Sequence, residues 1–107
     1  MKTTNIKQAL AIINEEYNSD DGLLVLFRLS SDVEEKRLDI FIEALKAIED
    51  YYLDKTLIEK HLVYRLLSFQ MALNSSAHHW KVSRPKGLTA QAVYNINMAI
   101  YDIFTND

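Results

Sequence analysis

Apolar residues recur along most of this chain at steps of three and four, the spacing of one face of an α-helix. In residues 4–17 this spacing joins Ile6, Leu10, Ile13 and Tyr17 and predicts a first helix. A polar run at 18–22 then interrupts the pattern. Within that run, Ser19 is placed to cap a second helix, and Asp20 and Asp21 are placed to favour its positive N-terminal end.

Residues 23–29 form a short, strongly apolar run. Such a run is compatible with a buried strand or with a helix, because it is too short for periodicity to decide. A helix is favoured, since no second strand is present to pair with it.

A capping box formed by Ser31 and Glu34 predicts a third helix, which runs to about Leu53. Next comes a predicted helix at 56–73 that is apolar nearly all round, which is typical of a helix in the middle of a bundle. Residues 74–76 are expected to end or kink it, with one further helical turn at 77–81.

The longest clear loop, residues 81–87, contains the only proline and one of the two glycines. Thr89 is placed to cap a last helix that reaches about Phe104, and Leu88 with Val93 suits a hydrophobic staple across this cap. The whole pattern predicts an all-α fold: a compact, single-domain bundle of about five to six helices over residues 1–107.

Composition agrees with this fold class. An apolar fraction of 49% excludes a disordered chain, and two glycines and one proline leave little provision for a β sandwich. The absence of cysteine excludes disulfides and thiolate zinc sites. Residues 1–11 lack the apolar stretch of a signal peptide, and no segment is apolar over about 18 residues. We therefore expect a cytoplasmic protein without a membrane partner.

No catalytic motif is evident, so we expect no enzyme activity, no catalytic residue and no cofactor. His61, His78 and His79 are not spaced to share a metal ion, because adjacent helical residues point about 100° apart. His61, Arg65 and Ser68 do share one face of the apolar fourth helix. That polar seam must face solvent, an acid from another helix or a ligand.

Charge divides the sequence. Thirteen of the fifteen acidic residues lie between Glu15 and Glu59, and only Asp102 and Asp107 lie outside that stretch. One group follows the third helix at helical spacing, and a second surrounds the first turn. The residues are Glu35, Asp39, Glu43 and Asp50 in the first group, and Glu15, Glu16, Asp20 and Asp21 in the second. These acids form either a solvated face or a docking surface for a basic protein.

A short basic island offers an alternative contact surface. It comprises Lys81, Arg84 and Lys86, next to Trp80, and Trp and Arg are frequent at binding hot spots. The same island suits weak nucleic-acid binding, but the following helix has no Lys or Arg, and a net charge of −3 argues against that as the main activity.

A further alternative is a helical interaction or regulatory module that forms homodimers. Ala92 and Ala99 lie on one flank of the last helix and would permit the close approach of a second helix. The sequence favours a monomer over a dimer for the isolated chain.

A small, acidic, cysteine-free helical chain of this kind resembles the immunity proteins that bacteria make against contact-dependent and other polymorphic toxins. The local likeness lies in the C-terminal part, from Trp80 through Gly87-Leu88-Thr89 into residues 99–104. The resemblance implies a cytoplasmic inhibitor that binds a cognate toxin domain, commonly a basic nuclease, and blocks its active site. It assigns no individual contact residue.

Overall fold

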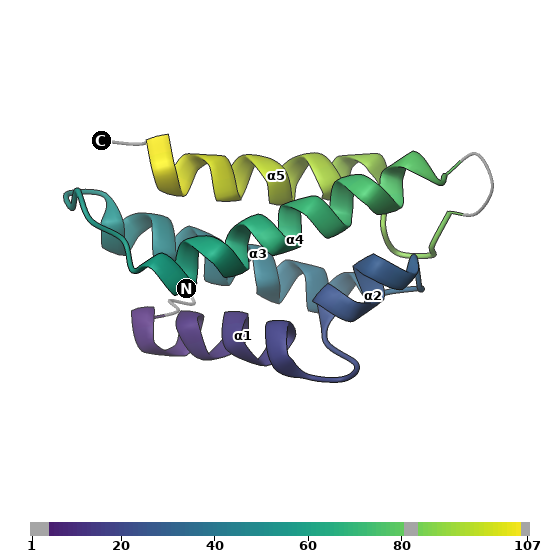
Figure 1. Cartoon of the computed structure of the whole chain (residues 1–107), viewed down its shortest axis with the longest axis horizontal. Coiled ribbons are helices and arrows are strands. Elements are labelled where there is room, and N and C mark those ends of the chain that lie inside the picture. The colour runs from purple at the N-terminus through teal and green to yellow at the C-terminus, as the bar shows by residue number, and fades with distance from the viewer. Residues whose placement is uncertain (1–4, 81–83, 106–107) are drawn as a thin grey trace.

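The structure is a computed structural model of the chain, and it describes residues 5–80 and 84–105. The fold is all-α, as predicted, with no strand among the described residues. Four long helices and one short helix follow one another along the chain (Figure 1). They are α1 (Ile6–Asn18), α2 (Leu23–Leu29), α3 (Glu35–Tyr52), α4 (Lys60–His78) and α5 (Ala90–Thr105). Ala77 and His78 belong to α4, so no separate turn begins at residue 77, and Lys81, the end of the expected turn, lies outside the described residues.

Helix α3 lies between α1 and α5 and packs against both, while α4 packs against α2 and α5 (Figure 1). Three phenylalanines meet in the core, where the ring centroids of Phe41 and Phe69 are 4.8 Å apart and those of Phe27 and Phe69 are 6.4 Å apart. The helix predicted at 56–73 is confirmed, but its bounds and its expected burial on all sides are not. The helix begins only at Lys60, and it exposes Leu67 and Met71.

Two helix starts follow the sequence closely. At α1, Gln8 N–H donates to Asn5 Oδ1 at 2.8 Å and Asn5 N–H donates to Gln8 Oε1 at 3.3 Å, which completes a capping box. At α5, Ala92 N–H donates to Thr89 Oγ1 at 3.0 Å, so the predicted threonine cap is confirmed. Both caps join residues that are three positions apart in the sequence.

The predicted start of the second helix is wrong. Residues 23–29 are helical, but Gly22 precedes α2, so Ser19, Asp20 and Asp21 all lie before it. Gly22 passes so close to α1 that a Cβ there would lie 2.3 Å from the carbonyl oxygen of Glu16. A glycine is therefore required at this turn.

The capping box predicted for Ser31 and Glu34 is also absent, since Glu34 directly precedes α3 and makes no side-chain cap. The segment before α3 is instead tied to the loop before α5. Val33 N–H donates to the carbonyl oxygen of Lys86 at 2.9 Å, and Lys86 N–H donates to Asp32 Oδ1 at 2.8 Å. Gly87 has φ 85°, and a Cβ on it would lie 1.9 Å from the Val33 carbonyl oxygen, so only glycine fits there.

Residues 74–76 neither end nor kink α4, which continues to His78. Asn97 Nδ2 donates to Asn74 Oδ1 at 3.0 Å, and the Ser30 and Ser76 hydroxyls share a hydrogen bond of 2.9 Å. These polar side chains find partners on other elements, so they do not compete for the backbone of their own helix.

None of the helices in the described ranges has the length and apolarity needed to cross a membrane.

Candidate functional site

Helix α3 carries an exposed row of acids, which we call the acidic ridge: Glu35, Asp39, Glu43 and Asp50. The row follows the helix for roughly 22 Å, given a rise of about 1.5 Å per residue over fifteen residues. The structure therefore brings these four predicted residues together on one accessible face. Lys46 lies among them and is also exposed.

Apolar surface borders the acidic ridge on the side toward α1. Ile40 and Tyr51 lie on α3 next to the acidic ridge, and their side chains are 46% and 42% exposed. Lys55 Nζ lies 4.1 Å from the centre of the Tyr51 ring and covers part of it, so Ile40 provides the more open apolar contact area beside the carboxylates.

A groove borders the ridge on the other side, between α3 and α5. Two hollows of about 290 and 200 Å³ share Ile42 and Asn95 in their walls and so form one continuous depression. Ile42, Ala92 and Ala99 give it apolar walls. Its charged lining consists of four acids and one lysine: Glu35, Asp39, Glu49, Asp102 and Lys46.

The groove changes the interpretation of the two alanines. Ala99 is buried, and both Ala92 and Ala99 line the groove between α5 and α3. Their small side chains permit the approach of α3 to α5 within the chain, and the hypothesis that they mediate a dimer through α5 stays a prediction.

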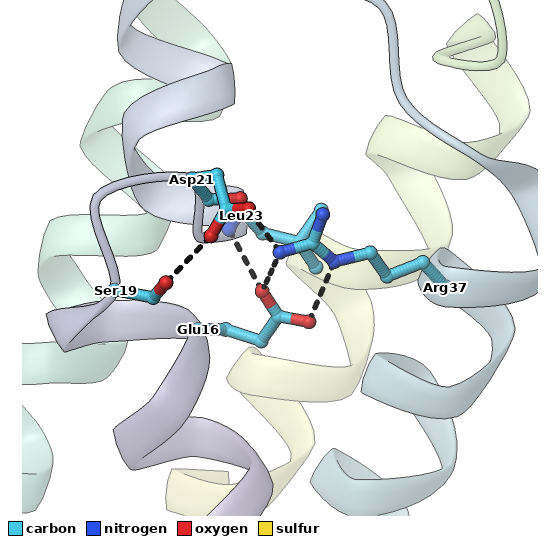
Figure 2. A network of polar contacts seen from close by, with 5 residues as sticks. All are labelled: Glu16, Ser19, Asp21, Leu23 and Arg37. Atoms are coloured by element: carbon cyan, nitrogen blue, oxygen red, sulfur yellow. Dashed lines mark hydrogen bonds and ion pairs between the residues drawn. The ribbon is translucent and has the colours of Figure 1, made fainter.

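Glu16 belongs to a network inside the fold. Figure 2 shows its carboxylate between Arg37 of α3 and the first residue of α2. Glu16 Oε1 accepts Leu23 N–H at 2.8 Å and Arg37 Nη2–H at 2.7 Å, and Glu16 Oε2 accepts Arg37 Nε–H at 2.9 Å. The hydrogen bond to Glu16 is the main reason that the pKa of Arg37 lies above its usual value. One carboxylate thus caps α2 and joins α1 to α3.

The second predicted group of acids, around the turn after α1, therefore contains one buried member and three exposed members. Glu16 is only 8% exposed, and its carboxylate is already engaged, so it offers nothing to a partner. Asp21 is exposed and accepts the Ser19 hydroxyl at 2.6 Å, which lowers the pKa of Asp21 (Figure 2). Glu15 and Asp20 are exposed near the same turn.

In the alternative surface around Trp80, the tryptophan is less accessible than its basic neighbours Arg84 and Lys86. Trp80 is partly buried against the core, and the Arg84 guanidinium lies over its ring at 4.9 Å. Lys86 is exposed, although its backbone is tied to Asp32 and Val33. Lys81, the remaining residue of the predicted basic island, lies outside the described residues. Arg84 covers ring surface that a partner would otherwise contact.

The polar seam of α4 turns toward α1. Arg65 donates to Asn14 Oδ1, and its guanidinium lies 5.3 Å from the centre of the Tyr17 ring. The Ser68 hydroxyl donates to the Tyr64 carbonyl oxygen at 2.9 Å. Arg65 in the seam therefore meets an amide and an aromatic ring of α1, whereas His61 is exposed to solvent, which was one of the expected options.

The three histidines, His61, His78 and His79, are exposed. The described part of the chain contains no group of three or more His, Asp or Glu side chains that could hold a metal ion.

Two features of the site did not emerge from the sequence. Arg37 was not anticipated as the partner of Glu16, because the two residues are 21 positions apart. The polar positions Gln91, Asn95 and Asp102 were recognisable as one face of the last helix, but only the packing shows that this face meets α3.

No family model matches this chain, and no curated protein or solved structure matches it. Its function must be argued from the surfaces described above.

Proposed function

We propose that this chain is an immunity protein that binds a cognate toxin domain, basic and of nuclease type, and neutralises it by covering its active site. The observation that carries the proposal is the acidic ridge, which is exposed along its length and bordered by apolar surface on both sides.

The chemistry of the partner follows from that of the ridge. A nuclease must attract phosphates, so its active-site cleft is positively charged. Carboxylates spaced along a rigid helix can occupy such a cleft, and complementary charge accelerates the encounter. Ile40, Tyr51 and the apolar walls of the groove would supply the desolvated contact area that charges alone do not provide.

Within the same function, the ridge is a better contact surface than the island around Trp80. A hot-spot tryptophan inserts its ring into a partner, whereas Trp80 packs against the core and beneath Arg84. Glu15 and Asp20 extend the proposed surface, and Asp21 lies beside them with its carboxylate bound to Ser19.

The proposal is tested by measuring binding to the product of a neighbouring toxin gene by titration calorimetry at several salt concentrations. We expect the double variant Asp39→Lys/Glu43→Lys to weaken binding at least about tenfold, which is roughly 1.4 kcal/mol, and to flatten its salt dependence. Unchanged affinity would eliminate the acidic ridge as the contact.

A matched pair of single variants separates position from overall charge. Asp39→Lys and Asp54→Lys change the net charge equally, and both residues are exposed, but Asp54 lies in the turn after α3. We expect Asp39→Lys to weaken binding several-fold and Asp54→Lys to change it less than about twofold. Equal effects would show that general charge, and not the ridge, attracts the partner.

A further inference from the structure

The groove between α3 and α5 is elongated. One of its hollows joins residues 35–42 to residues 87–95, and the other joins residues 42–49 to residues 95–102. The two helices therefore run in the same direction, as Figure 1 shows, and the groove follows both of them. Between Gln91 and Asp102 it extends for roughly 16 Å, given a rise of about 1.5 Å per residue. A depression of this shape suits a segment of polypeptide.

Negative charge is spread along the groove. Glu35 and Asp39 line the hollow at the start of α5, and Asp102 lines the hollow toward its end. Glu49 and Lys46 line the same hollow as Asp102. Within the described ranges, no three His, Asp or Glu side chains gather closely enough to hold a metal ion. The complementary ligand therefore carries positive charges at intervals, as a segment rich in Lys or Arg does.

The uncharged lining suits the other parts of such a segment. Gln91 and Asn95 line the groove, and Gln91 Nε2 donates to Asn95 Oδ1 at 2.8 Å. A carboxamide both donates and accepts, so each side chain keeps capacity beyond this bond for a peptide C=O or N–H. Ile42, Ala92 and Ala99 offer apolar wall to the methylene stems of Lys and Arg, whose charged ends reach toward the acids.

The spacing of these side chains matches that of an extended chain. Glu35 and Asp39 are four residues apart on α3, as Gln91 and Asn95 are on α5, so each pair is separated by about 6 Å along its helix. Alternate side chains of an extended chain recur on one face at about 6.7 Å. Successive cations of such a segment can therefore meet successive carboxylates of the groove.

We propose that the α3–α5 groove binds an extended segment of a basic partner protein, with Arg or Lys at alternate positions. The cationic side chains lie along the acids, and the backbone pairs with Gln91 and Asn95. The inference rests on the proposed function only for the source of the segment, which is then the toxin domain. A polyamine would match the charge, but it has no peptide groups for the two carboxamides, so the lining favours a peptide.

A capped peptide, acetyl-Arg-Thr-Arg-Thr-Arg-Thr-Arg-amide, tests the inference when it is titrated into the isotope-labelled full chain and followed by NMR. Its β-branched threonines favour an extended conformation. We expect the backbone amide signals of α5 around Asn95 to shift. Asn95→Leu removes a carboxamide without a change in net charge and should weaken binding at least about threefold, and Asp102→Asn should do the same. The same spectra verify that each variant folds.

Asp54→Asn is the matched control for Asp102→Asn, because it makes the same change in charge at an exposed residue in the turn after α3. We expect it to weaken binding less than about 1.5-fold. Equal effects of the two aspartate variants would overturn the inference, as would shifts confined to α3. Spermine that binds as tightly as the peptide and depends equally on Asn95 would also overturn it.

The peptide titrations require no toxin. A toxin domain that does not bind the chain would therefore eliminate the proposed function while the peptide result stands. Unshifted α5 signals, in contrast, would eliminate the groove as a peptide site and leave the acidic ridge to be tested by Asp39→Lys/Glu43→Lys.

Discussion

The turn after α1 and the outer face of α3 are both rich in acids, yet the fold uses them differently. At the turn, Glu16 is buried and bonded to Arg37 and to the start of α2. On α3, the acidic ridge remains on the surface along the whole helix. Sequence composition alone would treat these two groups as one acidic region.

The difference comes from where unsatisfied backbone groups are found. A helix start has N–H groups without partners inside the helix, and a carboxylate that reaches them is held there. Leu23 at the start of α2 provides such a group for Glu16. In the middle of α3 the backbone N–H groups are already bonded within the helix, so they do not hold its acids, and the acidic ridge stays exposed.

The largest effect is expected where this contrast is sharpest. Glu16→Gln removes the ion pair with Arg37 and weakens the cap on α2, and we expect it to lower the free energy of unfolding by about 1 to 3 kcal/mol. Glu15→Gln is the matched control, because Glu15 is the exposed neighbour, and it should change stability by less than about 0.5 kcal/mol.

Urea unfolding at neutral pH measures both Glu16→Gln and Glu15→Gln. Equal stability of the two variants would show that Glu16 is as dispensable to the fold as a surface acid. The proposed contrast between the turn after α1 and the acidic ridge would then be wrong.

Glu59 extends the comparison to an exposed acid that the fold nonetheless uses. The Tyr52 hydroxyl donates to Glu59, which lowers the pKa of Glu59. Burial of Tyr52, with this hydrogen bond to Glu59, raises the pKa of Tyr52 to about 12. The hydrogen bond joins the end of α3 to the residue before α4, so it holds the corner between them.

A raised tyrosine pKa means that the folded state resists ionisation. The stabilisation is complete below pH 10 and is lost as the pH rises toward 12, where the unfolded chain ionises first. We expect this loss to be on the order of 1 to 2 kcal/mol and to disappear in Tyr52→Phe. Tyr51→Phe, at the exposed neighbour, should retain it. Unfolding curves collected from pH 9 to 12 distinguish the two variants, and identical alkaline profiles would refute the assignment.

The smallest effect on stability is expected at the acidic ridge. Glu35, Asp39 and Glu43 are spaced by four residues, so neighbouring carboxylates repel one another by a few tenths of a kcal/mol. Asp39→Lys/Glu43→Lys should therefore change the free energy of unfolding by no more than about 0.5 kcal/mol, whatever it does to binding of the proposed partner. A thermal melt of this variant checks the first part, and a large loss of stability would mean that the ridge serves the fold.

Sequence rules based on helical periodicity and helix capping succeeded for some features whose residues lie close together in the chain. Periodicity predicted the all-α fold, and Thr89 caps α5 as its position indicated. The same rules failed at Ser31 and Glu34, because the backbone before α3 is paired with Lys86 of a distant loop. They also failed for residues 56–73, since apolar residues on every face do not show which face the neighbouring helices cover.

By itself, the sequence determined that the fold is all-α and that Glu35, Asp39 and Glu43 share one face of α3, because helical spacing is a local property. Only the tertiary structure decided that Glu16 joins α1 to α3 through Arg37 and to α2 through the Leu23 N–H, that α5 forms a groove with α3, and that Met71 and Tyr101 remain exposed. Those outcomes depend on which helices pack together, and helix packing is set by contacts between residues far apart in the chain.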